Sequence, residues 1–225
     1  MPGAHVHERH GHDWIIHWAG LYDLTTGLLG RRGHQLRASI ADRLKLRPGD
    51  RVLDVGSGPG RLAMVLAQRV GPTGSVNGID PSKEMVARAI AKTRRAGVPA
   101  RFQEAFAQQL PFADASFDAV TCTLALHHVA DPDRPIAVAE MYRVLRPGGS
   151  LLIGEFQATS RGRRWPRLHH FRAGNTIEQA RELAASAGFT DIQYADTSLS
   201  WLGTLTAVKP ISPTAHGERD AVREE

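Results

Sequence analysis

The chain has 225 residues, of which 42% are hydrophobic, so it fits one α/β domain with short additions better than two enzymes in series. Its formal net charge is +5, but 23 acidic residues are mixed with 28 basic ones, so charge gives little support to a nucleic-acid-binding protein. The single cysteine, Cys122, excludes an intramolecular disulfide. Because the chain also has no secretory signal and no run of about 18 apolar residues, we predict a cytoplasmic protein without a membrane span.

Residues 1–48 are predicted to form a histidine-rich segment followed by a helical lid. Four histidines between residues 5 and 12 have a spacing that suits a divalent ion if the segment is ordered. We favour a solvated segment instead, and we predict no metal site. Residues 13–46 carry apolar side chains at helical spacing and end before a Pro-Gly pair, which indicates a helix.

The rest of the chain alternates between short aliphatic runs, typical of buried strands, and segments with helical periodicity. The predicted strands cover residues 51–55, 75–79, 100–105, 117–122, 150–156, 191–196 and 202–208. The predicted helices cover residues 61–70, 82–95, 133–145 and 176–187, with Ser82 as an N-cap and Gly188 as a C-terminal stop. No helix separates the last two strands. This order predicts a mostly parallel seven-stranded sheet with a C-terminal antiparallel hairpin and helices on both faces. We assign residues 49–209 to this domain and residues 210–225 to a disordered tail.

A glycine-rich turn follows the first buried strand. Gly56, Gly58 and Gly60 stand at every second position, where they let the backbone turn sharply and approach a ligand without a Cβ. The next helix offers unpaired N–H groups in the same crevice. A dinucleotide-binding turn would favour glycine at position 61, where this chain has Arg61.

Asp80 ends the second predicted strand, about twenty residues after the turn. A carboxylate there can accept hydrogen bonds from both ribose hydroxyls of a nucleoside. The structural alternative is that Asp80 caps the following helix beside Pro81-Ser82. The glycine turn and the acid together favour nucleoside binding, whereas the turn alone would be weak evidence.

Four motifs in this order resemble those of class I, Rossmann-like S-adenosylmethionine-dependent methyltransferases. They are VLDVGSGPGRLA, GIDPSKEMVARA, LPFADASFDAV and LHHVADPDRPIAVAEMYRVLRPGG. The resemblance spans about residues 50–209 and is to the small-molecule branch. An upstream segment, LYDLTTGLLG, is loosely similar to the ubiquinone and menaquinone C-methyltransferases. The resemblance implies a Rossmann-like sandwich, S-adenosylmethionine as cofactor and S-adenosylhomocysteine as product.

The resemblance also implies roles for individual residues. Asp54, Gly56, Ser57, Gly58 and Gly60 would line the methionine part of the cofactor, with Asp54 near its ammonium group. Asp80 would hold the ribose and Met85 would pack on the adenine, while Thr123 and Leu124 would lie along the sulfonium side. Ordinary core packing is the alternative for Met85 and Leu124. The implied cofactor-binding set is Asp54, Gly56, Ser57, Gly58, Gly60, Asp80, Pro81, Met85, Phe106, Ala107, Thr123 and Leu124.

One departure from the family pattern concerns the adenine. Related proteins usually carry a Gly-Asp-Ala-like stretch whose Asp bonds the adenine amino group, and here Ala105, Phe106 and Ala107 take its place. Phe106 would stack on the adenine or merely cover it. The missing acceptor is the best argument from the sequence for a degenerate, non-catalytic member.

The candidate general bases are His127 and His128, which follow the fourth predicted strand. The alternative is that one histidine points into the core and the other caps the next loop. For substrate contacts, the candidates are Trp14, Trp18 and Tyr22 in the lid and Arg164 and His169 in a basic segment, with plain packing and a solvated loop as the alternatives.

These observations favour methyl transfer to an O, N or C atom of a small molecule by direct in-line displacement. A degenerate cofactor-binding scaffold and a nucleic-acid or protein methyltransferase are the alternatives. The latter is disfavoured because no Asn-Pro-Pro-Tyr-like motif follows the fourth strand, where the chain reads Thr-Cys-Thr-Leu. The sequence leaves a homodimer through the N-terminal helices open.

Overall fold

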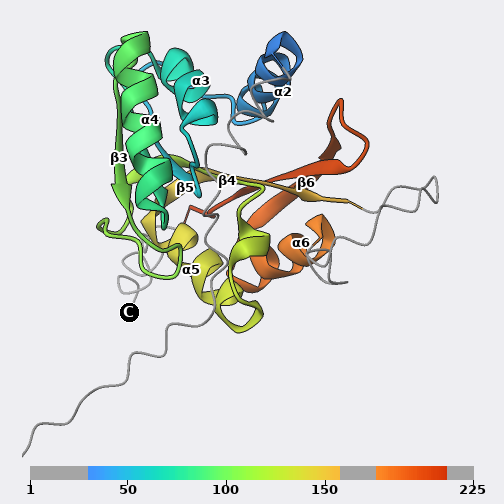
Figure 1. Ribbon diagram of the computed structural model, residues 1–225. Coiled ribbons are helices and arrows are strands. Elements are labelled where there is room, and N and C mark those ends of the chain that lie inside the picture. The colour runs from blue at the N-terminus through green and yellow to red at the C-terminus, as the bar shows by residue number, and fades with distance from the viewer. Residues whose placement is uncertain (1–29, 158–175, 212–225) are drawn as a thin grey trace, which may run out of the picture.

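The computed structural model describes residues 30–157 and 176–211, which form an α/β sandwich around one twisted sheet (Figure 1). The strand order in the sheet is β3-β2-β1-β4-β5-β7-β6. The strands from β3 to β5 pair in parallel, whereas β7 pairs antiparallel with both β5 and β6. The strand bounds are β1 Arg51–Val55, β2 Ser75–Asp80, β3 Ala100–Glu104, β4 Phe117–Thr123, β5 Leu145–Phe156, β6 Thr190–Asp196 and β7 Leu202–Val208. The predicted fold is therefore confirmed.

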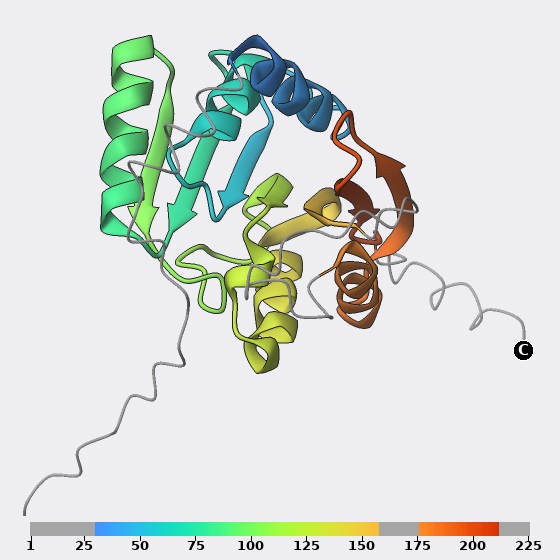
Figure 2. The ribbon, with the colours of Figure 1, turned by 45° about the vertical axis from the view of Figure 1, so that its right-hand side comes forward.

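The helices cover both faces of the sheet. Figures 1 and 2 show α2, α3 and α4 on one face and α5 and α6 on the other. Their bounds are α2 Gly30–Asp42, α3 Arg61–Val70, α4 Lys83–Ala96, α5 Arg134–Val144 and α6 Ile177–Ser186, and two 3-10 turns, η1 Leu126–His128 and η2 Asp131–Asp133, precede α5. In the described ranges, no helix is both long enough and apolar enough to cross a bilayer.

Each face of the sheet has its own apolar core. Val52 and Leu152 face the core under α2 and α3, whereas Leu53, Val120 and Ile153 face the core under α5 and α6. Successive strand residues point to opposite faces, so both faces of these central strands must be apolar. This explains why the strands read as continuous aliphatic runs.

The order in which successive strands are added to the sheet reverses between the parallel neighbours β1 and β4. These strands are paired neighbours, but β1 leads towards β2 and β3, while β4 leads towards β5 on the other side. Connections that leave two adjacent parallel strands in opposite directions open a crevice at their carboxyl ends. The glycine turn after β1 and the histidine segment after β4 both lie at this edge of the sheet.

Two predicted boundaries differ from the structure by more than one residue. The expected helix over residues 13–46 is, within the described part of the chain, α2, which ends at Asp42 and is followed by a turn in which Lys45 has a φ of 51°. The fifth strand begins at Leu145 rather than at residue 150. Leu145 already pairs with Phe117. The Gly148 N–H donates to the Lys209 carbonyl and the Gly149 carbonyl accepts from the Lys209 N–H, so the segments on both sides hold the Pro-Gly-Gly stretch extended. The N-cap prediction is confirmed, because Ser82 Oγ accepts a hydrogen bond from the Met85 N–H.

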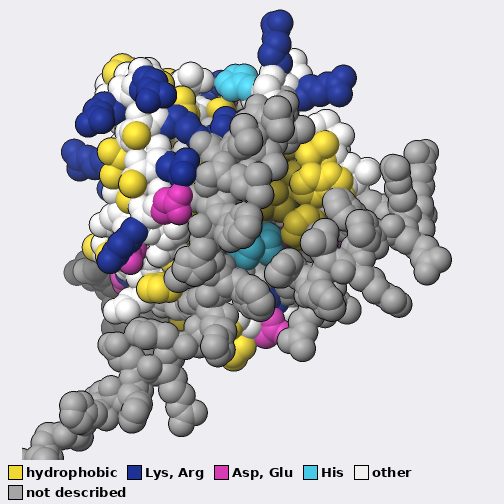
Figure 3. Space-filling model, in the orientation of Figure 1, with side chains coloured by type: hydrophobic (Ala, Val, Ile, Leu, Met, Phe, Trp, Pro, Cys, Tyr) yellow, Lys and Arg dark blue, Asp and Glu magenta, His cyan; other side chains and the backbone are white. Residues whose placement is uncertain are grey.

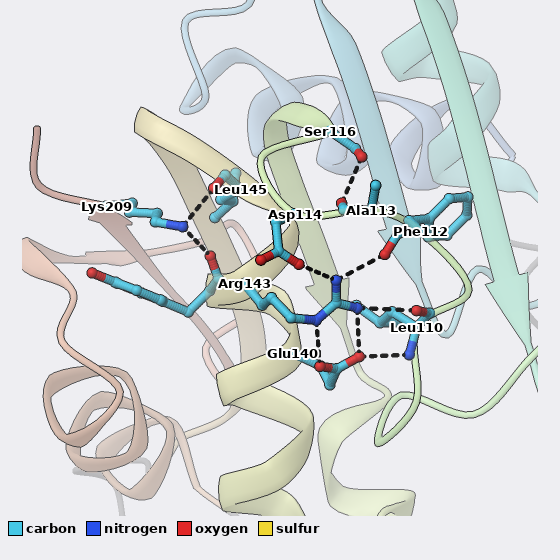
Figure 4. Close-up of polar contacts among 10 residues, drawn as sticks. Leu110, Phe112, Ala113, Asp114, Ser116, Glu140, Arg143, Leu145 and Lys209 are labelled. Atoms are coloured by element: carbon cyan, nitrogen blue, oxygen red, sulfur yellow. Dashed lines mark hydrogen bonds and ion pairs between the residues drawn. The ribbon is translucent and has the colours of Figure 1, made fainter.

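One arginine clamps the loop before β4 onto α5 (Figure 4). The Arg143 guanidinium donates to the Glu140 carboxylate at 2.6 and 2.8 Å and to Asp114 at 2.7 Å. It also donates to the backbone carbonyls of Leu110 and Phe112, at 3.1 and 2.8 Å. Hydrogen bonds to charged groups contribute more than neutral ones, so this cluster fixes a loop that has no regular secondary structure.

The C-terminal end of α5 is closed by Lys209, the last residue of the predicted domain. Its Nζ donates to the carbonyls of Tyr142 and Leu145 at 2.9 and 2.8 Å (Figure 4). A cation near the unpaired carbonyls of a helix end is electrostatically favourable. Residues 212–225, most of the predicted tail, lie outside the described residues, so the division into lid, domain and tail stays a prediction.

Candidate functional site

A cavity of about 240 Å³ opens at the carboxyl ends of β1, β2 and β4. Its walls come from the glycine turn, the end of β2, the loops after β3 and β4, α2 and the β6–β7 hairpin. It is lined by Asp54, Gly56, Ser57, Gly58, Asp80, Pro81, Met85, Phe106, Ala107, Thr123, Leu124 and His128 among the predicted site residues. Gly60 and His127 do not line it. The predicted substrate residues Trp14, Trp18, Tyr22, Arg164 and His169 lie outside the described residues.

The three glycines of the turn serve different purposes. All three have positive φ, at 67°, 50° and 75° for Gly56, Gly58 and Gly60. A Cβ on Gly56 would lie only 2.2 Å from the Ala125 Cβ, because the loop after β4 crosses directly over the turn. A Cβ on Gly60 would meet Ala89 and Phe102 at 3.0 Å, so this glycine seats the turn against α4 and β3. Gly60 therefore supports the cavity wall from behind.

Asp80 fastens two backbone segments at the edge of the cavity. Its Oδ2 accepts a hydrogen bond from the Gly58 N–H at 2.9 Å, and its Oδ1 accepts one from the Ser82 N–H at 2.9 Å. Burial raises the pKa of this carboxyl, while the two backbone hydrogen bonds oppose the shift. The N-cap of α4 is Ser82, and Asp80 supports the start of this helix only by accepting the Ser82 N–H. This contact does not exclude a ligand, because each carboxylate oxygen can accept a second hydrogen bond.

Three buried polar atoms in the cavity wall have no hydrogen-bond partner among the described residues. They are Asp54 Oδ2, Ser57 Oγ and Thr123 Oγ1, and all three residues line the cavity. The other carboxylate oxygen of Asp54 accepts a 2.7 Å hydrogen bond from the Thr121 hydroxyl. Buried polar groups in folded proteins are nearly always paired, so this wall is built for a polar ligand.

The titration of Asp54 should be visible in the stability of the protein. Burial raises its pKa from an ordinary 3.8 to about 7, with the Thr121 hydrogen bond opposing the shift. A raised carboxyl pKa contributes stability that is present below the unfolded value and is lost as the pH rises towards about 7. In urea unfolding without ligand, we expect the free energy of unfolding of wild type to fall by about 2 kcal/mol relative to Asp54→Asn between pH 5 and pH 8.

The control for this measurement is Asp42→Asn, because Asp42 is exposed and pairs only with the surface residue Arg69 among the described contacts. Its pH curve should run parallel to that of wild type. If Asp54→Asn also runs parallel to wild type, the carboxyl is not titrating in this range and its burial does not have the effect described.

The two predicted bases occupy different environments. His128 lines the cavity. His127 is turned to Glu155 at the end of β5, with 2.9 Å between Nδ1 and Oε2, and both side chains are largely buried. The two imidazole rings are 4.1 Å apart between centroids. Thus, Glu155 orients His127, and the His127 ring lies against the ring of His128, which lines the cavity.

A buried arginine holds the histidine segment in place. The Arg134 guanidinium donates to the backbone carbonyls of Val129 at 3.0 Å and His127 at 3.4 Å, and to Gln179 of α6 at 3.1 Å. Only 4% of its side chain is exposed. These contacts connect the segment after β4 to α5 and α6, so the histidines stand on a fixed loop.

Several cavity residues were not predicted from the sequence. The α2 helix contributes Leu36, Arg37 and Ile40, and the β6–β7 hairpin contributes Leu199 and Trp201. Gln108 lines the cavity two residues after Phe106, where the family acid is missing. The one available signal for these residues was Trp201, an aromatic residue next to a strand. Nothing in the local sequence pattern indicates that the β6–β7 hairpin reaches the same cavity as the glycine turn.

Comparison with known proteins agrees with the geometry. Residues 52–149 match a family model described as a methyltransferase domain. The chain is 40% identical over 156 residues to 27-O-demethylrifamycin SV methyltransferase of Amycolatopsis mediterranei, an alignment covering 68% of this chain and 52% of that protein. It is 39% identical over 143 residues to demethylmenaquinone methyltransferase of Thermus thermophilus, covering 63% of each.

Residues 52–149 are thus identified as a methyltransferase domain. This is the family that the four sequence motifs predicted. The chain spans between about half and 63% of the length of these relatives. What the whole protein acts on is therefore a separate question.

Two solved structures show how widely the fold is used. A SAM-dependent methyltransferase from Aquifex aeolicus superimposes with a TM-score of 0.70 at 21% identity, over 85% of this chain and 96% of that one. The [4+2]-cyclase SpnF superimposes with a TM-score of 0.69 at 26% identity, over 86% of this chain and 96% of that one. The methyltransferase domain thus shares its architecture with a protein named for a different reaction.

Proposed function

We propose that this protein transfers the methyl group of S-adenosylmethionine to an O, N or C atom of a small-molecule acceptor by direct in-line displacement. The proposal rests on three buried polar atoms beside the glycine turn, on Asp54, Ser57 and Thr123, that have no hydrogen-bond partner in the described part of the chain. S-adenosylmethionine is an amino acid joined to a nucleoside, so its polar groups could form hydrogen bonds with these three atoms. The methyltransferase names of the relatives support the same reaction class.

The residues present fit this cofactor. Asp54 would attract the ammonium group, with Gly56, Ser57 and Gly58 along the methionine chain, and Gly60 holding the turn from behind. Asp80 would accept hydrogen bonds from the ribose. For the adenine, an apolar pocket is formed by Pro81, Met85, Phe106 and Ala107, of which Phe106 is 39% exposed and can cover the ring.

Thr123 and Leu124 would stand beside the reacting centre. Leu124 has a φ of 52°, and its N–H donates to the Gly154 carbonyl at 2.8 Å. A non-glycine residue in this region carries backbone strain that the surrounding structure must hold, and such residues cluster at functional sites. When bound, S-adenosylmethionine supplies an activated methyl group, so the chain has only to align the acceptor and keep water out.

His128 would remove a proton from the acceptor, with His127 and Glu155 behind it. If so, His128→Ala should bind S-adenosylhomocysteine like wild type but lower the rate of methyl transfer about 100-fold or more. Turnover is followed as transfer of a labelled methyl group to an acceptor found by screening. Unchanged turnover in both His127→Ala and His128→Ala would show that the acceptor needs no base and that the histidines are structural.

Calorimetric titration with S-adenosylhomocysteine tests the cofactor site. We expect one site per chain with an affinity in the micromolar range. The absence of binding at millimolar ligand would contradict the proposal.

The alternative function is a cofactor-binding protein of this fold that performs no methyl transfer. Two observations favour it as the second candidate: Phe106 stands where the family acid is expected, and a [4+2]-cyclase shares the fold at 26% identity. It predicts binding of S-adenosylhomocysteine without transfer of the labelled methyl group to any acceptor. Methylation of a nucleic acid or a protein would be detected by the same transfer of a labelled methyl group. The predicted homodimer can be tested separately by light scattering.

A further inference from the structure

The part of the cavity wall formed by α2, the segment after β4 and the β6–β7 hairpin is largely apolar. We call it the acceptor wall, and it consists of Leu36, Arg37, Ile40, His128, Val129, Leu199, Trp201 and Leu202. Apart from Arg37 and His128, its side chains are apolar. Leu36, Leu199 and Trp201 are only partly buried by the described residues. Figure 3 shows hydrophobic side chains gathered next to a histidine on this side of the molecule.

Aromatic rings run continuously from Trp201 to His128. The centroids of Trp201 and Phe156 are 5.6 Å apart with the planes tilted by 34°, and Phe156 lies 5.0 Å from His127. His127 in turn lies 4.1 Å from His128. Both ends of this run, Trp201 and His128, line the cavity.

Trp201 sits on a loop that is tied down on several sides. The backbone N–H of Gln157, next to Phe156, donates to the Trp201 carbonyl at 3.0 Å. The Gln157 side chain donates to Ser200 O at 3.1 Å and to Asp196 Oδ1 at 3.0 Å. A Cβ on Gly203 would lie 2.6 Å from Gln157 Oε1, so the glycine makes room for this clamp.

The same loop is also fastened to the helix across the cavity. The Arg43 guanidinium, just after α2, donates to the Asp196 carbonyl at 2.6 Å. The backbone of Trp201 is therefore held in place before any ligand arrives, and Phe156 packs beside the indole. A rigid aromatic surface loses little conformational entropy on binding, which favours a ligand that matches its shape.

We infer that Trp201 is a stacking platform that selects a flat aromatic acceptor, with Gln157 as the residue that positions it. This inference rests on the proposed function and names its substrate class. Rings favour offset or edge contacts with other rings, and the apolar neighbours Leu36, Ile40 and Leu199 suit an aromatic body. Among the described residues of the acceptor wall, only Arg37 and His128 have hydrogen-bonding side chains that suit a polar acceptor, fewer than a sugar-like molecule would need.

The test uses two probes that share one carbon skeleton and differ in flatness: 2-naphthol and decahydro-2-naphthol. Each is titrated into the full-length protein saturated with S-adenosylhomocysteine. We expect wild type to bind 2-naphthol about tenfold more tightly, and Trp201→Leu to lose most of that preference. Trp201→Phe should keep part of it.

Two further variants complete the experiment. Gln157→Ala should reduce the preference without changing the affinity for S-adenosylhomocysteine, because it loosens the hairpin and leaves the glycine turn intact. Ile136→Ala changes an exposed apolar residue of α5 outside the cavity and should keep the preference.

The outcomes separate the two proposals. If S-adenosylhomocysteine binds but the two probes bind equally, or neither binds, the inference is overturned and the cofactor site stands. A preference that survives in Trp201→Leu overturns it as well. If S-adenosylhomocysteine itself does not bind, the proposed function fails first.

Discussion

Replacing Asp80 with Ala is expected to weaken binding of S-adenosylhomocysteine by about 100-fold or more. Two hydrogen bonds from ribose hydroxyls to a carboxylate contribute about 1.5–3 kcal/mol each, and losing both corresponds to this factor. The substitution also removes the acceptor for the Gly58 and Ser82 N–H groups, which loosens the turn that would hold the methionine part. Calorimetry on wild type and variant measures the ratio.

The matched control is Asp42→Ala, because Asp42 is also an aspartate but is exposed on α2 and paired with Arg69 at 2.8 Å. It should leave the affinity unchanged, since a surface ion pair contributes about 0–1 kcal/mol to stability alone. Thermal unfolding of both variants separates loss of fold from loss of the site. An Asp80→Ala protein that is folded and binds within about threefold of wild type would show that Asp80 acts only as a cap.

Gly56→Ala is expected to destabilise the protein by about 3 kcal/mol or more, because left-handed strain and overpacking act at the same position. The backbone φ there is 67°, and the added Cβ would lie 2.2 Å from the Ala125 Cβ. The turn after β1 and the loop after β4 would have to separate, and the cavity lies between them. Urea unfolding and titration with S-adenosylhomocysteine should therefore both change.

Two variants resolve the causes of this loss. Gly97→Ala has a similar φ of 65° and open space around it, so it should cost only about 1 kcal/mol of strain. In Gly56→Ala/Ala125→Gly, the nearest heavy atom to the new Cβ would be the Cα of residue 125 at 3.6 Å, so stability should recover to about the level of Gly97→Ala. Failure of this rescue would mean that the crossing loop is not what requires glycine.

Much of the candidate site could be located from the sequence because its residues lie next to strand ends. Asp80 and Thr123 are the last residues of their strands and Asp54 is the last but one of β1, and the carboxyl ends of parallel strands meet at one edge. Gly60 was placed in the cofactor pocket for the same reason. The structure puts it behind the wall, because spacing along a turn does not say which way each residue faces.

By itself, the sequence determined the α/β order, the resemblance to methyltransferases and the part of the cavity that is proposed to bind the cofactor, since these depend on local patterns within each strand and the residues just after it. Which residues form the acceptor wall was decided only by the tertiary structure. Trp201 and Leu36 are 165 positions apart in the sequence, and they line one cavity only because β7 returns beside β5 and α2 packs across the sheet. No local period encodes such a contact, because the packing of distant segments fixes it.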